Sequence, residues 1–155
     1  MVKHIFSTII VLAFLVGCTD EESSNTKEEN DKWERSPTFV SANREMVGIE
    51  GKVGLLGGDF VANEESKQMW HFWGDSEFLF ENYFIVEATH EDTDIVIDLF
   101  RLTPSGPNNG ADAHQPSSIE LPETGGWKLD VYFYDKHEND PDEKGLFETI
   151  VIEVK

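Results

Sequence analysis

The chain has 155 residues and a formal net charge of −19, from 31 acidic and 12 basic side chains. A surface this acidic repels phosphate backbones, so the composition argues against a nucleic-acid partner and favours cationic ligands or basic partner proteins. The sequence has one cysteine, which excludes an intrachain disulfide framework.

The first 17 residues have the three parts of an export signal. Lys3 precedes an apolar run over residues 5–16, which is too short for a membrane-spanning helix because such a helix needs about 20 apolar residues. The run ends in Leu15-Val16-Gly17-Cys18, a pattern typical of lipoprotein cleavage sites. We therefore predict removal of residues 1–17 and lipidation of Cys18. The alternatives are a plain secretory signal and a buried apolar helix.

Lipidation predicts the location of the mature protein. Two acyl chains, such as palmitate, on a thioether at Cys18 give durable anchoring, whereas one chain gives only marginal binding. We expect a protein held at the extracytoplasmic face of the cell membrane, with the lipid as its membrane contact.

Residues 18–36 are expected to form a disordered acidic tether. Residues 19–32 contain no large apolar side chain, so this segment cannot offset its ordering entropy by burial. A flexible tether of this length spans roughly 20–25 Å. The remaining residues, 37–155, have the size of one domain.

Alternating apolar residues predict an all-β domain of about seven short strands separated by turn residues. This pattern is typical of an antiparallel two-sheet sandwich, with a small β-barrel as the alternative. The predicted strands are 47–56, 68–73, 84–89, 95–99, 117–121, 127–134 and 150–154.

One segment favours an immunoglobulin-like sandwich. Glu123-Thr124-Gly125-Gly126-Trp127 is similar to the corner before strand F of such domains, with a tryptophan where a tyrosine usually lies. Trp127 shares a face with Leu129, Val131 and Phe133, so we expect it to anchor the core.

Several segments together resemble a family of small uncharacterised lipoproteins of Gram-positive, spore-forming bacteria. The resemblance covers most of residues 37–155 and implies a surface lipoprotein with an all-β domain of unknown function. It implies no catalytic residues. The segments are Met69-Trp70-His71-Phe72-Trp73-Gly74, Asn109-Gly110-Ala111-Asp112-Ala113-His114, Pro116-Ser117-Ser118-Ile119-Glu120-Leu121-Pro122, Gly126-Trp127-Lys128-Leu129-Asp130 and Ile150-Val151-Ile152-Glu153-Val154.

Residues 103–116 form the strongest candidate binding loop. They include no aliphatic side chain larger than alanine, and a connection of this length in a compact domain is typically functional or disordered. Three prolines favour an ordered path. The polar residues that we expect to contact a ligand are Asn109, Asp112 and His114.

The sequence leaves two classes of function open. The first is a non-enzymatic interaction module that binds another envelope protein or a cationic ligand without a cofactor. The second is an extracytoplasmic enzyme or metal-binding protein that uses His71, Asp112 and His114, although no HExxH motif is present. The acidic residues 135–143 are rich in calcium-ligand oxygens, but their spacing does not fit a helix–loop–helix calcium site.

Overall fold

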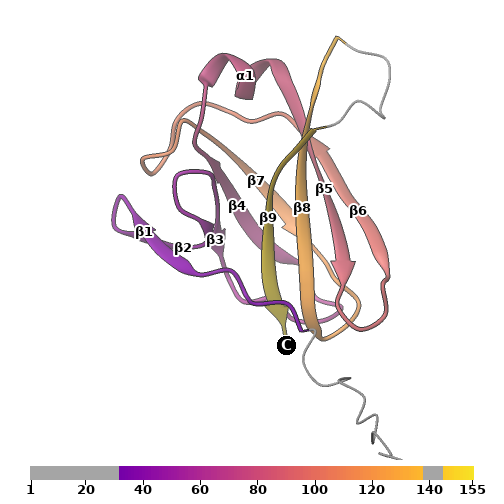
Figure 1. Ribbon diagram of the computed structural model, residues 1–155. Helices are drawn as coiled ribbons and strands as arrows, with labels where there is room; N and C mark the ends of the chain where they lie inside the picture. Colours follow the sequence, from indigo (N-terminus) through magenta and orange to yellow (C-terminus); the bar gives the residue numbers. More distant parts are fainter. Residues whose placement is uncertain (1–31, 138–144) are drawn as a thin grey trace, which may run out of the picture. The chain divides into compact units, whose positions relative to one another are not determined.

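A computed structural model describes residues 32–137 and 145–155, which form two antiparallel sheets packed face to face (Figure 1). The first sheet has the strand order β1-β2-β3-β4-β7, and the second has the order β6-β5-β8-β9. The strands are β1 Thr38–Ser41, β2 Arg44–Ile49, β3 Val53–Gly57, β4 Ser66–Phe72, β5 Asn82–His90, β6 Val96–Leu102, β7 Ala113–Ile119, β8 Gly125–Asp135 and β9 Gly145–Val154. The predicted all-β sandwich is confirmed, with nine strands in the described residues instead of seven.

The strand order is that of an immunoglobulin-like Greek key. The strands β3-β4-β7 take the places of A-B-E, and β9-β8-β5-β6 take those of G-F-C-C′. The hairpin β1–β2 is added beside β3, and no described strand takes the place of D. By this correspondence β8, which begins at the predicted corner, is strand F.

The sequence did not predict two of the nine strands. It predicted a single strand over residues 47–56 and none at β1. This segment is a hairpin, because Glu50-Gly51 turns the chain and the Lys52 N–H donates to the Ile49 carbonyl at 3.0 Å. The preceding strand β1 has only four residues, too few for a clear alternation. The hairpin and β1 together account for the increase from seven strands to nine.

The core lies between the sheets and follows the predicted alternation. Trp127, Leu129, Val131 and Phe133 of β8 are each at most 3% exposed. They face an aromatic cluster on the opposite sheet, in which Phe72 contacts Phe133 at a centroid distance of 5.4 Å. Period-two patterning therefore assigned the buried face of β8 correctly.

One short helix, α1 (Ser76–Glu81), connects β4 to β5 at the end of the sandwich (Figure 1). Asp75 caps it, because its Oδ1 atom accepts a hydrogen bond from the Phe78 N–H at 2.9 Å. Six residues are too few to show a helical period in the sequence. No helix in residues 32–137 or 145–155 has the length and apolar character needed to cross a membrane.

Candidate functional site

The predicted binding loop is ordered and shorter than expected. Strand β7 already begins at Ala113, and Pro116 lies inside this edge strand, where a missing N–H is tolerated. The loop proper is therefore 103–112. It contains a tight turn in which Asn108 and Ala111 exchange backbone hydrogen bonds of 3.2 and 2.9 Å. Asn109 and Gly110 have φ values of +48° and +83°, as a type I′ turn requires.

Asn109 holds His71 against the outer face of β4. The Nδ2 atom of Asn109 donates to His71 Nε2 at 3.0 Å, and His71 Nδ1 donates to the Met69 carbonyl at 3.2 Å. These contacts define the neutral tautomer of a completely buried imidazole. Burial lowers the pKa of His71 below its ordinary value, and the nearby His114 acts in the same direction. The His71 ring also packs beside an aromatic ring, because the centroid of the Trp73 ring lies 6.3 Å away.

Asp112 and His114 join the same network. Asp112 Oδ2 accepts a hydrogen bond from the Gly74 N–H at 2.9 Å. His114 lies directly opposite His71 in the β4–β7 ladder, and its Nδ1 donates to the Gly106 carbonyl at 2.5 Å. The fold thus brings all the candidate residues together, but their polar atoms serve to fix the loop.

This network gives no support to the metal-binding alternative. His71 uses both ring nitrogens within the chain, and residues 32–137 and 145–155 hold no group of three potential metal-ligating side chains. The acidic segment 135–143 lies mostly outside the described residues.

A partly exposed apolar row lies beside this network on the outer face of the first sheet. Leu56, Met69 and Pro116 are direct neighbours across β3, β4 and β7. They line an open groove of about 500 Å³, with Lys67 and Ser118 also lining it. The loop borders the row, because Asn108 Nδ2 contacts Met69 Sδ at 3.3 Å. The residues of this groove come from three separate strands, so the sequence pattern did not predict it.

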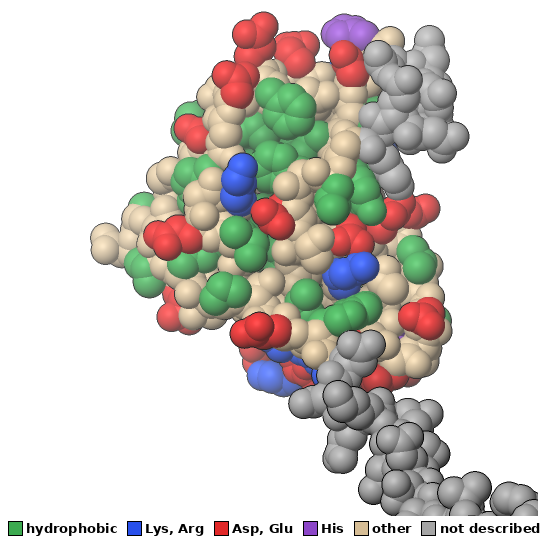
Figure 2. All heavy atoms as spheres, in the orientation of Figure 1, with side chains coloured by type: hydrophobic (Ala, Val, Ile, Leu, Met, Phe, Trp, Pro, Cys, Tyr) green, Lys and Arg blue, Asp and Glu red, His purple; other side chains and the backbone are tan. Residues whose placement is uncertain are grey.

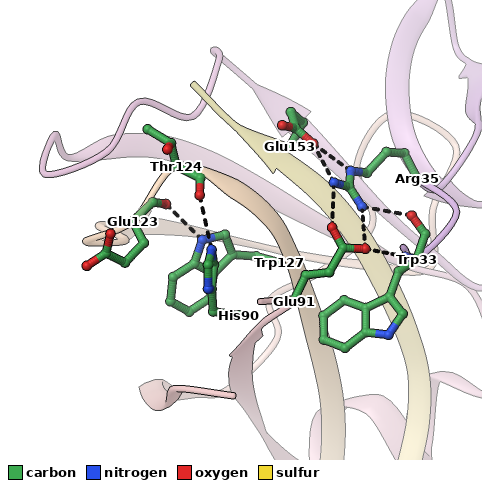
Figure 3. Close-up of polar contacts among 8 residues, drawn as sticks. All are labelled: Trp33, Arg35, His90, Glu91, Glu123, Thr124, Trp127 and Glu153. Carbon is green, nitrogen blue, oxygen red and sulfur yellow. Dashed lines mark hydrogen bonds and ion pairs between the residues drawn. The ribbon is translucent and has the colours of Figure 1, made fainter. Parts of the chain in front are cut away.

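A second cluster, at the other end of the sandwich, lies where a tether was predicted (Figure 3). Arg35 bonds to Glu91 at 3.0 Å and to Glu153 at 2.6 Å, and the Trp33 N–H also donates to Glu91. The Glu91 side chain is only 4% exposed. The hydrogen bond from Arg35 lowers the pKa of Glu91 below its ordinary value. The last residues of the proposed 18–36 tether therefore contact the domain.

Gly126 provides the space for this ion pair. A Cβ atom at position 126 would lie 2.4 Å from Glu91 Oε2 and 2.6 Å from Arg35 Nη1. Any larger residue would displace one of the two charged groups. The segment Gly125-Gly126 is thus part of the corner before β8 and also leaves room for the contact between Arg35 and Glu91.

The corner itself has the geometry expected from the sequence (Figure 3). The Nε1 atom of Trp127 donates to the Glu123 carbonyl at 2.9 Å, four residues upstream. The His90 ring packs against the indole at 4.9 Å, and its Nε2 donates to the Thr124 carbonyl at 3.0 Å. Trp127 therefore takes the structural role of the tyrosine at this corner.

Comparison with protein families classifies the chain. Residues 23–140 match the family model described as a domain of unknown function, DUF4871. The chain belongs to this family. No curated protein matches the chain significantly.

The DUF4871 domain also has a solved structural relative. This relative is the crystal structure of a candidate lipoprotein from Bacillus anthracis, which is 22% identical in sequence and superposes with a TM-score of 0.58. The match covers 80% of this chain and 87% of the relative. At this identity the comparison establishes a shared fold.

His71 should make the stability of the domain depend on pH. Because its pKa is lowered in the folded state, the unfolded chain binds a proton first as the pH falls. The free energy of unfolding should therefore decrease below the ordinary histidine pKa of about 6.5, by at most about 1.4 kcal/mol per pH unit. Urea unfolding at pH 7.5 and 5.5 should show this decrease, and His71→Gln should remove it. His137→Gln, at a side chain 79% exposed, should leave it unchanged; the reverse pattern would contradict the assignment.

Proposed function

We propose that this DUF4871 protein is an extracytoplasmic lipoprotein, anchored to the cell membrane through lipid on Cys18. The supporting observation is the sequence Leu15-Val16-Gly17-Cys18 after a short apolar run. The description of the structural relative as a candidate lipoprotein agrees with it. Residues 1–17 would be removed, and Cys18 would become the first residue of the mature chain.

We further propose that the sandwich domain is a non-enzymatic interaction module. The observation that carries this proposal is the use of the candidate catalytic groups: His71, Asp112 and His114 are all engaged in bonds that fix the loop. The groove lined by Leu56, Met69 and Pro116 remains open beside them. A shallow apolar surface bordered by an ordered loop suits the recognition of a partner protein better than the activation of a substrate.

The charge of the domain indicates the kind of partner. Figure 2 shows acidic side chains spread over the face of the molecule between groups of hydrophobic side chains. With a net charge of −19 for the whole chain, association with a basic envelope protein or a cationic peptide would be accelerated by electrostatic attraction. The same charge would oppose flat contact with anionic lipid.

Cys18→Ser tests the anchoring. The variant should accumulate as an unprocessed precursor or leave the membrane fraction, because a serine hydroxyl cannot form the thioether. Cell fractionation with immunoblotting measures both outcomes. Ser23→Ala, a substitution in the same segment that spares the cysteine, is the control and should fractionate like the original protein. Processing and membrane retention of Cys18→Ser at the original level would refute the proposal.

A further inference from the structure

Within the described residues the two open sheets leave four edge strands, and three of these edges are short, partly covered or interrupted by a proline. The outer edge of β9 is occupied over its C-terminal part. The Ser36 N–H donates to the Val151 carbonyl at 2.9 Å, and Phe60 and Ala62 each make a 2.9 Å backbone bond with Lys155. An added strand therefore finds no free row of backbone groups along the C-terminal part of β9.

The edges of β7 and β1 are also protected. Ser105 and His114 exchange two backbone bonds of 2.7 and 3.2 Å along β7, and Pro116 removes a donor from the same strand. Strand β1 has only four residues. Short, covered or proline-containing edges are the usual means by which proteins prevent unwanted strand pairing.

The seven-residue strand β6 differs from these three. It pairs with β5 on one side, and within the described part of the chain no other strand lies on its outer side. The His90 N–H donates to the Ile95 carbonyl at 2.9 Å, which identifies this pair as hydrogen-bonded. Since antiparallel pairs alternate, the backbone N–H and C=O groups of Val96 and Asp98 point away from β5.

The core is incomplete along the same edge. Phe84, Val86 and Ala88 of β5 are at most 1% exposed, whereas their partners on β6 are only partly buried. The partly buried side chains that pack against the core are Ile97, Leu99, Phe100 and Leu102. Val96 is 60% exposed at the start of the strand. A further strand beside β6 would bury these side chains.

On the outer face of the second sheet, next to this edge, three acidic side chains form a row across neighbouring strands. Asp98 lies directly opposite Glu87, and Glu87 lies opposite Asp130 of β8. Asp130 forms an ion pair with Lys128 at 3.3 Å, whereas Asp98 has no ion-pair partner among the described residues. Like charges directly opposite one another destabilise a sheet, whereas an opposite charge in the next strand stabilises it.

We propose that β6 binds an extended segment of a basic partner protein as an added strand, with a Lys or Arg side chain of this segment beside Asp98. Backbone bonds to Val96 and Asp98 would supply affinity, and alternate apolar side chains would cover the exposed side of the core. This surface is separate from the groove on the other sheet. The proposal names a partner contact for the interaction module, and so rests on that proposed function.

The test uses the full chain and a synthetic peptide of alternating lysine and valine. Hydrogen exchange should show protection of the Val96 and Asp98 amides when the peptide is added. The same peptide with a central proline should give no protection. Protection elsewhere, or none, would overturn the proposal, as would dimerisation of the chain through β6 without peptide, seen by light scattering.

Charge exchange identifies the residue responsible. Asp98→Lys should weaken binding of the lysine–valine peptide about five-fold and strengthen binding of a glutamate–valine peptide. Asp98→Asn removes the charge without reversing it. Its affinity for the lysine–valine peptide should lie between that of the original protein and that of Asp98→Lys. Glu120→Lys, an equal change at an exposed position, is the control. Equal losses in Asp98→Lys and Glu120→Lys would show general attraction to the acidic chain and refute the β6 site. Membrane anchoring through Cys18 is tested separately by fractionation.

Discussion

Replacing Trp127 with alanine should lower the free energy of unfolding by about 3–5 kcal/mol. The indole is completely buried at the start of β8, where it packs between His90 of β5 and Ile152 of β9. Typical domains are stable by only about 5–15 kcal/mol. Urea unfolding followed by far-ultraviolet circular dichroism should therefore find a marginally stable variant.

Trp127→Phe separates packing from hydrogen bonding. Phenylalanine retains much of the buried ring but leaves the Glu123 carbonyl without its 2.9 Å donor. We therefore expect the free energy of unfolding to fall less than in Trp127→Ala, with about 1 kcal/mol of the loss due to the missing hydrogen bond. Val40→Ala, at a side chain 63% exposed, is the control and should change stability by less than about 0.5 kcal/mol. A loss below about 1 kcal/mol for Trp127→Ala would show that the corner does not anchor the fold.

The second large effect is expected at Arg35. Arg35→Met keeps the aliphatic stem but removes the guanidinium from Glu91, whose carboxylate is almost completely buried. The loss should be about 2–3 kcal/mol, because a buried charged acceptor loses its main donor. A fragment that begins at Pro37 should be destabilised to a similar extent, since it lacks the Trp33 and Arg35 contacts.

The pH dependence identifies Glu91 as the partner. Its lowered pKa means that the ion pair stabilises the fold above the ordinary glutamate pKa, and that this stabilisation is lost as the pH falls through the lower folded value. The difference between the original protein and Arg35→Met should therefore shrink in acid. Lys155→Met removes an exposed ion pair with Asp59 and should cost less than about 0.5 kcal/mol. Equal effects of the two substitutions would contradict the Arg35 assignment.

Period-two alternation predicted the strands that carry the core. Leu129, Val131 and Phe133, and likewise Ile150, Ile152 and Val154, face inward because one side of each strand is apolar and the other is polar. The same reasoning did not divide residues 47–56, where Glu50-Gly51-Lys52 interrupts the apolar residues for only three positions. Hairpins of this kind are determined by the turn more than by the alternation.

The sequence grouped the residues of the candidate loop, but it did not show which atoms their side chains bond to. Asn109 lies in a turn whose conformation directs its side chain to His71, and the identity of that acceptor depends on long-range pairing of β4 with β7. The ion pairs of Arg35 could not be predicted from the sequence for a related reason. The preceding residues 19–32 are polar and indicate disorder, while Glu91 and Glu153 are distant in the chain.

The mass of the protein extracted from the membrane tests the central claim most directly. Intact-protein mass spectrometry should find a chain that begins at Cys18 and carries the added mass of a diacylglycerol group. Release of this mass by tandem fragmentation of the N-terminal peptide should assign the lipid to the cysteine sulfur. A membrane-associated chain that retains residues 1–17, or one that begins at Cys18 without lipid, would contradict the account.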